Sequence, residues 1–150
     1  MNPSDPIFLE CLVQIKADEG FRSHAYVCPA GALTVGYGRN IDTGGPGITD
    51  AEAQVLLSND ISECDADLAK VFAGWAGFSL RRRATLVNLR FQLGPSRFRA
   101  FRKMIAAIEN GDWTEAAKEF NDLSFKRAYP RITFSASDCL NERPPHIVLR

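Results

Sequence analysis

The chain has 150 residues with 18 basic and 18 acidic side chains, so its formal net charge is zero. An apolar content of 45% and a charged content of 24% are typical of a soluble globular protein and exclude a disordered or fibrous one. A chain of this length can bury enough apolar surface to fold without disulfides, as one domain or as two small lobes sharing a core. No stretch is long and apolar enough to span a membrane.

The charge is unevenly distributed along the chain. Residues 1–60 hold three basic and eight acidic side chains, whereas residues 61–150 hold fifteen basic and ten acidic ones. A basic half suggests an anionic polymer as partner, either nucleic acid or cell wall. A solvated helix surface explains the same charges more simply. Because the basic residues have little aromatic interleaving and form no recognised motif, we do not expect nucleic-acid binding.

The cysteines and histidines do not form a metal-binding pattern. Cys11, Cys28, Cys64 and Cys139 are far apart in the sequence and none has a partner at ligand spacing. We therefore expect reduced thiols, no metal and no cofactor, with Cys11 in the core on the apolar face of a helix. The N-terminus lacks a basic segment followed by an apolar run, so we expect synthesis in the cytoplasm without a signal peptide.

The first forty residues predict a helix followed by a glycine-rich hairpin. Apolar side chains recur at helical spacing over residues 8–15, and Gly20 can take the left-handed conformation that ends a helix. Glu19 then lies in the last turn, where the helix dipole disfavours an anion; such a carboxylate is either functional or simply exposed. Strand-forming residues at 25–27 and 33–37 flank a Pro-Ala-Gly turn, the pattern of a β-hairpin.

The remainder of the chain predicts helices. Thr49 or Asp50 caps a helix of about six turns, which is long enough to connect two lobes. Three shorter helices are expected at residues 80–93, 98–109 and 113–123. Ser96 is expected to cap the second of these and Asp112 the third. Helical periodicity is lost from residue 124 onward, so we expect residues 124–150 to be irregular.

Glu19, Cys28 and Thr34 are separated by eight and by five residues. This spacing resembles the active-site pattern of the phage-type lysozymes, the family of the T-even phage lysozyme and many endolysins, in which Glu is followed by Asp or Cys and then by Thr. The neighbouring segments EGF, LTVGYGRN, NLRFQLG and GDW resemble the family as well. The resemblance covers roughly residues 7–123.

The resemblance implies an α+β, mainly α fold with two lobes. A small N-lobe holds the β-hairpin or sheet, a long helix connects it to a helical C-lobe, and the substrate lies in the cleft between them. We expect residues 1–150 to form a single lysozyme-like domain, with an N-lobe of about residues 1–60 and a C-lobe of about residues 61–150. Residues 124–150 do not resemble the helices that usually close the family's fold.

The resemblance also implies a glycoside hydrolase that acts on peptidoglycan. Such a muramidase, or endolysin, cleaves the β-1,4 bond between N-acetylmuramic acid and N-acetylglucosamine to lyse the host cell wall. Its partner is the glycan strand, and we expect a monomer that does not insert stably into a membrane and reaches the periplasm by release or delivery. The alternative, motivated by the atypical C-terminus, is a non-catalytic or weakly active wall-binding module on a lysozyme scaffold.

The chemistry of glycoside cleavage gives each residue of the pattern a role. An acid must protonate the leaving oxygen, and Glu19 suits that role if partial burial keeps it protonated. Most glycosidases use a carboxylate as the second group, and Cys28 takes that position here. As a thiolate Cys28 would be a nucleophile or a base that orients water, and as a neutral thiol it would only occupy space. The resemblance implies that Thr34 orients the water or the second group, although Thr34 alone is most simply a strand residue.

Four further residues are candidates for substrate binding. Tyr26 and Tyr37 can stack on sugar faces, and core packing explains each of them equally well. Arg39 follows the glycine-rich strand where the family often has His or Arg, and we interpret it as a cleft-edge or inter-strand charge partner. Gln92 matches a residue that lines the family's cleft.

Overall fold

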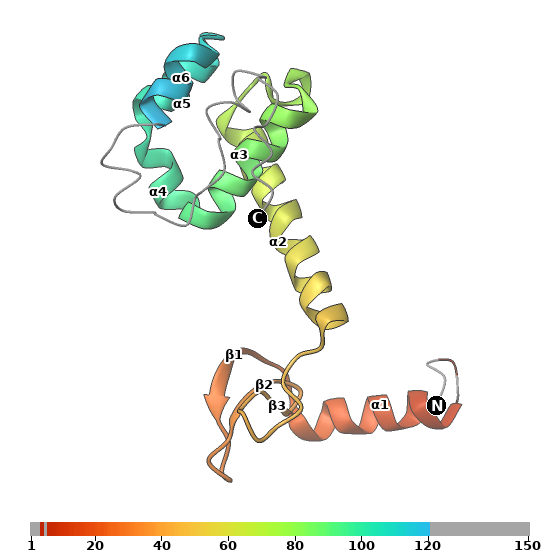
Figure 1. The fold of residues 1–150 in the computed structure, drawn as a ribbon. Helices are drawn as coiled ribbons and strands as arrows, with labels where there is room; N and C mark the ends of the chain where they lie inside the picture. Colours follow the sequence, from red (N-terminus) through yellow and green to blue (C-terminus); the bar gives the residue numbers. More distant parts are fainter. Residues whose placement is uncertain (1–3, 5, 121–150) are drawn as a thin grey trace, which may run out of the picture. The chain divides into compact units, whose positions relative to one another are not determined.

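The computed structural model describes residue 4 and residues 6–120. They are mainly helical with one small antiparallel sheet, so the predicted α+β, mainly α class is confirmed (Figure 1). The chain divides into two compact units, Met1–Val55 and Leu56–Arg150. Within the described residues, no helix combines the length and the apolar character needed to cross a bilayer.

The first unit contains one helix and a three-stranded sheet. Helix α1 (Pro6–Glu19) ends at the predicted position, because Gly20 adopts a φ of +66° and its amide donates to the carbonyl of Lys16 at 3.2 Å. Strands β1 (Arg22–Val27), β2 (Leu33–Gly36) and β3 (Arg39–Asn40) follow in the order β1-β2-β3, and both pairings are antiparallel.

The turn between β1 and β2 is the predicted hairpin connection. The amide of Gly31 donates to the carbonyl of Cys28 at 2.8 Å, and the amide of Cys28 donates to the carbonyl of Ala32 at 2.9 Å. Pro29 supplies the φ value that the second position of such a turn requires, and Gly31 takes the left-handed conformation with a φ of +85°. The backbone hydrogen bonds of the turn therefore fix the register between β1 and β2.

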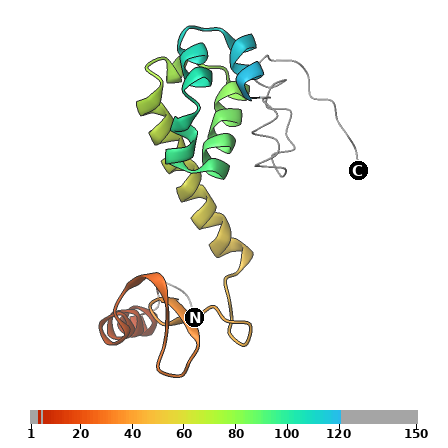
Figure 2. The same cartoon turned by 90° about the vertical axis from the view of Figure 1, so that its left-hand side faces the viewer.

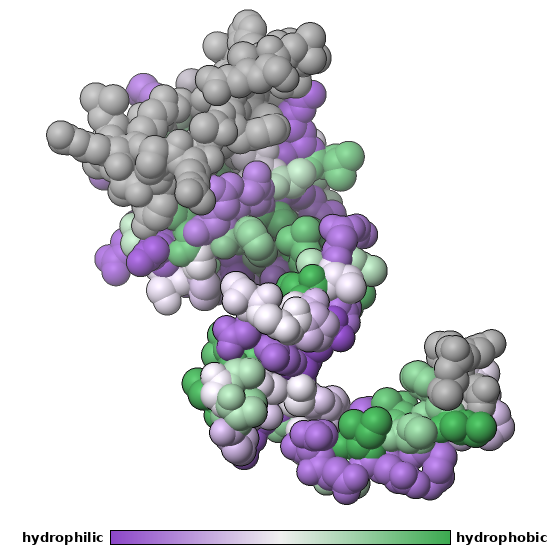
Figure 3. Space-filling view, turned by 60° about the horizontal axis from the view of Figure 1, so that its bottom comes forward, coloured by the Kyte–Doolittle hydropathy of each residue, from purple (hydrophilic) through white to green (hydrophobic). Residues whose placement is uncertain are grey.

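Helix α1 buries none of its residues. Its apolar side chains, including Leu12 and Ile15, are exposed and gather along one side of the helix (Figure 3). The prediction that Cys11 lies in the core is wrong, since its side chain is exposed. Helical periodicity identified an apolar face but could not say whether another element covers it.

The second unit is a bundle of helices. Helix α2 (Asp50–Val71) begins in the first unit and continues into the second, which also contains α3 (Leu80–Leu93), α4 (Pro95–Ala100), α5 (Arg102–Glu109) and α6 (Trp113–Phe120) (Figure 2). A short 3-10 helix, η1 (Trp75–Gly77), connects α2 to α3. The long helix and the helix at residues 80–93 are as predicted.

Among the described residues, every buried apolar side chain lies in the second unit. The core consists of Leu68, Phe72, Trp75, Leu86, Leu89, Leu93, Phe98, Met104, Ala107, Ile108, Ala116, Ala117 and Phe120. Cys64 is buried on the same side of α2, as its place in the apolar pattern predicts.

The single helix predicted at residues 98–109 is instead two helices. The chain breaks between α4 and α5 at Phe101, whose ψ of 56° is outside the helical region. Phe98 is fully buried and Phe101 packs against the same core, so the break lets both rings face the core. Ser96 does not cap a helix, because α4 already starts at Pro95, which suits a first turn.

Asp112 caps α6 as predicted, since its carboxylate accepts from the amide of Glu115 at 2.9 Å. Helix α6 is described only as far as Phe120. The predicted helix end at residue 123, the irregular segment 124–150 and Cys139 lie outside the described residues.

An ion-pair cluster around the largely buried side chains of Arg90 and Asp67 joins three helices of the second unit. The guanidinium of Arg90 donates to Asp67 and to Glu63, both at 3.0 Å, and to the sulfur of Cys64 at 3.2 Å. Arg99 also donates to Asp67, so one carboxylate of α2 holds arginines from α3 and α4. These hydrogen bonds, first that of Arg99 and then that of Arg90, lower the pKa of Asp67.

We predict that Asp67→Asn lowers the free energy of unfolding of the second unit by about 3 kcal/mol at pH 7, because Arg90 would lose a charged partner in a site where it is only 10% exposed. A carboxyl with a lowered pKa in the folded state stabilises the protein above its unfolded pKa, about 3.9, and this stabilisation is lost as the pH falls through the folded value. The difference between wild type and variant should therefore be constant from pH 7 to about pH 5 and shrink below about pH 4.

Urea unfolding followed by tryptophan fluorescence measures this difference, because Trp75 and Trp113 are the two tryptophans of the chain and both lie in the second unit. Asp60→Asn, which removes an exposed carboxylate from the same helix, is the matched control. An equal loss in the two variants would contradict a stabilising role for the cluster.

Candidate active site

The first candidate, Glu19, is the last residue of α1 and lies against the backbone of Gly38. A Cβ atom placed on Gly38 would stand 3.0 Å from Oε2 and 3.2 Å from Cδ of Glu19. The turn between β2 and β3 thus approaches the carboxylate so closely that a side chain at Gly38 would require Glu19 to shift by a few tenths of an ångström. The carboxylate is otherwise exposed, so the partial burial expected for an acid is not present in the described residues.

The second and third candidates, Cys28 and Thr34, lie together in the β1–β2 hairpin. Thr34 stands in the central strand β2, pairs with Tyr26 on one side and Asn40 on the other, and is only 3% exposed. Cys28 begins the turn and is half-buried. The backbone amide of Ala32 and then the hydroxyl of Thr34 hydrogen-bond to the Cys28 sulfur and lower the pKa of Cys28.

The hydroxyl of Thr34 can serve only one acceptor at a time, since it carries one hydrogen. It lies 3.0 Å from the carbonyl oxygen of Ala32, to which it donates. When Cys28 is a neutral thiol this arrangement leaves the Thr34 oxygen free to accept the S–H hydrogen. When Cys28 is a thiolate the hydroxyl turns and donates to the sulfur, which is the interaction that lowers the pKa of Cys28. Thr34 can therefore serve as a hydrogen-bonding partner of Cys28 in both the thiol and the thiolate form.

The two tyrosines each have an aromatic or cationic neighbour within the first unit. The ring of Tyr37 lies 5.5 Å from that of Phe21, and the amino group of Lys16 lies 5.2 Å from the Tyr37 ring. The guanidinium of Arg22 lies 5.7 Å from the Tyr26 ring. Tyr37 remains 42% exposed, so packing leaves part of its ring available. A contact of either tyrosine with substrate stays a prediction.

Sequence reasoning missed Phe21, which is 65% exposed beside Tyr37. The sequence could have indicated Phe21 as a site residue, because it follows Glu19 by two positions. An exposed aromatic pair next to the candidate acid is a surface on which the apolar face of a sugar ring can stack.

Arg39 anchors β3 to the start of α2. Its Nε donates to the carbonyl of Gly47 at 2.7 Å, and its Nη2 lies 3.3 Å from Oε2 of Glu52. Glu52 also accepts from the amide and the hydroxyl of Thr49, at 2.7 and 2.8 Å, while its own amide donates to the Thr49 hydroxyl. This is a capping box, and it lowers the pKa of Glu52, mainly through Thr49. A substrate contact for Arg39 stays a prediction.

Gln92 belongs to the second unit. It is exposed on α3 and donates to the side chain of Asn88 at 2.8 Å. Asn88 and Phe91 line an apolar groove of about 540 Å³ between α2 and α3, to which Leu57 and Ile61 also contribute. Sequence reasoning did not find this groove, because it is formed by residues more than twenty positions apart.

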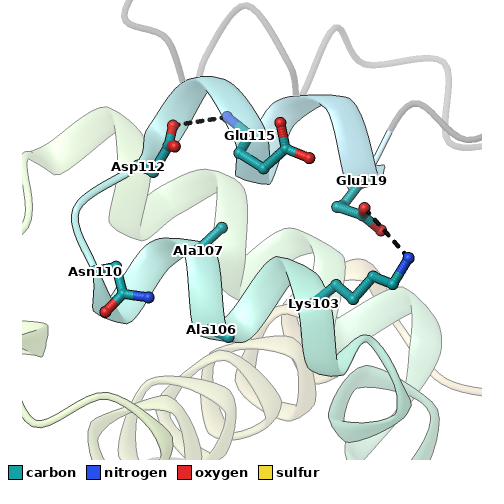
Figure 4. A pocket seen from close by; sticks show the side chains of 7 residues that line it. All are labelled: Lys103, Ala106, Ala107, Asn110, Asp112, Glu115 and Glu119. Atoms are coloured by element: carbon teal, nitrogen blue, oxygen red, sulfur yellow. Dashed lines mark hydrogen bonds and ion pairs between the residues drawn. The ribbon is translucent and has the colours of Figure 1, made fainter.

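A second hollow, of about 490 Å³, lies between α5 and α6 (Figure 4). Its charged side chains already have partners in the fold. Lys103 pairs with Glu119, and Asp112 caps α6 through the amide of Glu115. The hollow is therefore a feature of helix packing and contains none of the predicted site residues.

Comparison with known proteins supports the resemblance seen in the sequence. The model of the phage lysozyme family matches residues 16–130. An endolysin from Acyrthosiphon pisum secondary endosymbiont phage 1 is 32% identical over 111 residues, which is 73% of either chain. A probable T4-type lysozyme 1 from Dictyostelium discoideum is 26% identical over 91 residues, 57% of this chain and 52% of the relative.

We predict that Cys28 is alkylated by iodoacetamide at lower pH than Cys11, an exposed thiol of the same unit, and roughly threefold or more faster at pH 7. Thr34→Val removes the hydroxyl donor and should move the alkylation profile of Cys28 toward higher pH. Thr34→Ser keeps the hydroxyl and serves as the control. Mass spectrometry of the alkylated peptides measures both cysteines in one sample. Identical profiles for Cys28 and Cys11 would rule out a stabilised thiolate.

Proposed function

Because the chain belongs to the phage lysozyme family, and therefore to the lysozyme and endolysin type of glycoside hydrolase, we propose that it cleaves the β-1,4 bond between N-acetylmuramic acid and N-acetylglucosamine in host peptidoglycan. The observation that carries the proposal is the arrangement of Glu19, Cys28 and Thr34. They stand at the family's spacing, and the last two lie in one hairpin, where the hydroxyl of Thr34 contributes, after the backbone amide of Ala32, to the lowered pKa of Cys28.

Glu19 is the proposed acid that protonates the glycosidic oxygen, since an alkoxide is a poor leaving group. The carboxylate is exposed when no substrate is present. A bound glycan strand would cover it and displace water, which strengthens the interaction between the acid and the glycosidic oxygen. In this proposal the substrate itself excludes water from the acid.

Cys28 is the proposed second group. A thiolate at this position can attack the anomeric carbon as a nucleophile or orient and deprotonate the incoming water. Both routes need the thiolate, and the amide of Ala32 and the hydroxyl of Thr34 favour that form. Thr34 is buried in the central strand, which keeps its side chain near the sulfur while the hydroxyl turns between its two acceptors.

Substrate binding is assigned to residues that surround these groups. Tyr37, with Phe21 beside it, is proposed to stack on a sugar face, and Tyr26 and Arg39 are proposed contacts on the same sheet. Gln92 is a proposed contact from the second unit. We propose that the single-domain chain acts as a monomer on the periplasmic wall after its release or delivery.

We predict that Glu19→Gln lowers the rate of wall hydrolysis by at least about a hundredfold, because the amide cannot donate a proton as an acid does. Clearing of permeabilised Gram-negative cells, measured by turbidity, compares it with wild type. Asp18→Asn removes the adjacent exposed carboxylate and should keep full activity. Activity that survives Glu19→Gln would disprove the acid role.

The sugar at the reducing end of the products shows which bond is cut. Borohydride reduction of the released fragments followed by mass spectrometry should give muramitol ends, as expected when the cut follows N-acetylmuramic acid. Reduced glucosamine ends would place the cut at the other bond. Binding to isolated peptidoglycan without any release of reducing sugar would instead support the wall-binding module.

We predict that Cys28→Asp retains activity within about tenfold, because a carboxylate is the usual second group of glycosidases, whereas Cys28→Ala loses at least about a hundredfold. The same assay measures both variants, with Cys11→Ala as the control for loss of a thiol elsewhere. A fully active Cys28→Ala would show that the thiol only occupies space.

A further inference from the structure

We propose that Gly38 is a positioning residue that fixes the carboxylate of Glu19, and that this position requires both the backbone conformation and the missing side chain of glycine. The inference rests on the proposed function, because it gives the acid Glu19 its place. Gly38 does not touch reacting atoms and acts only through Glu19.

The geometry at Gly38 differs from an ordinary tight turn. Its φ is +76°, a value that side-chain-bearing residues adopt at a cost. A Cβ atom there would also meet three atoms of one side chain, at 3.0 Å from Oε2, 3.2 Å from Cδ and 3.7 Å from Cγ of Glu19. The first two distances are tighter than nearly all real Cβ contacts, so the Glu19 carboxylate would have to shift by a few tenths of an ångström to make room for a Cβ atom.

The turn that carries Gly38 is held on both sides. Val35 and Arg39 are paired across β2 and β3, which closes the turn at its base. Tyr37, the residue before Gly38, contacts the ring of Phe21 and the amino group of Lys16 from the last turns of α1. The backbone at Gly38 is therefore fixed to the helix that ends in Glu19.

Gly36 shows that the two requirements can be separated. Its φ is +66°, so it shares the backbone conformation of Gly38 in the same stretch of chain. A Cβ atom on Gly36 would meet nothing within 4 Å. An alanine at Gly36 thus reproduces the backbone strain of an alanine at Gly38 without the collision with Glu19.

We expect an alanine at Gly38 to reduce catalysis more than it reduces stability. Glu19 is exposed, so an added methyl group would push the flexible carboxylate into solvent without disturbing a core. The acid would remain ionisable but leave the position from which it protonates the leaving oxygen. A displacement of about 1 Å at such a group can cost on the order of a hundredfold in rate, so a shift of a few tenths of an ångström is expected to cost roughly tenfold.

The experiment compares Gly38→Ala with Gly36→Ala on soluble glycan fragments prepared from peptidoglycan. Both variants should lose similar amounts of thermal stability. For Gly38→Ala we expect kcat to fall by roughly tenfold with KM within about twofold of wild type, whereas Gly36→Ala should keep kcat within about threefold. Equal losses of kcat in the two variants would overturn the proposal.

A double-mutant cycle tests whether Gly38 acts through Glu19. Glu19→Asp shortens the side chain and removes the atoms nearest to the added methyl group. In the Glu19→Asp background, Gly38→Ala should therefore cost at most about threefold more in kcat. The same fold loss in both backgrounds would contradict a contact-based role.

A measurement on the unmodified chain is independent of activity. The α protons of Gly38 and the γ protons of Glu19 should give a nuclear Overhauser effect, with Glu19 assigned by comparison with Glu19→Gln. Its absence would overturn the proposed positioning even in an active enzyme. A wild type without hydrolysis that shows the effect would instead reject the proposed function and leave the contact established.

Discussion

The hydrogen bonds of the Cys28–Gly31 turn determine the arrangement of the candidate site. They set the pairing of β1 with β2 so that Thr34 lies opposite Tyr26 in the middle of the sheet. The same turn brings the amide of Ala32 to the sulfur of Cys28. A register shift of one residue would turn Thr34 to the other face of the sheet and separate it from the thiol. The chemistry proposed for Cys28 thus depends on backbone geometry before it depends on any side chain.

Local chemistry made several features predictable from the sequence. Gly20 ends α1, the Pro-Ala-Gly turn forms the hairpin and Asp112 caps α6, because each depends on residues within one turn of chain. Features that depend on distant packing were not predictable. The exposure of Cys11 and the helix break at Phe101 depend on which surfaces are covered, and periodicity does not contain that information. The approach of Gly38 to Glu19 likewise joins residues that are far apart in the sequence.

The two units use charge differently. In the second unit the carboxylate of Asp67 is only 16% exposed and satisfies two arginines, so its charge is part of the packing. In the first unit the proposed acid is exposed and the proposed thiolate is held by backbone amides. Groups placed as in the first unit can gain or lose a proton without unfolding their surroundings. This suits residues that must gain and lose protons in a reaction.

The single carboxylate oxygen of Glu52 that receives Arg39 also receives the amide and hydroxyl of Thr49. One atom therefore completes both the start of the long helix and the edge of the sheet. Fraying of the first turn of α2 would leave Arg39 with only the carbonyl of Gly47 as a partner, and opening of β3 would remove a partner of the cap. The two events should belong to one cooperative opening, so the amides of the sheet edge and of the first helical turn would exchange with solvent at a common rate.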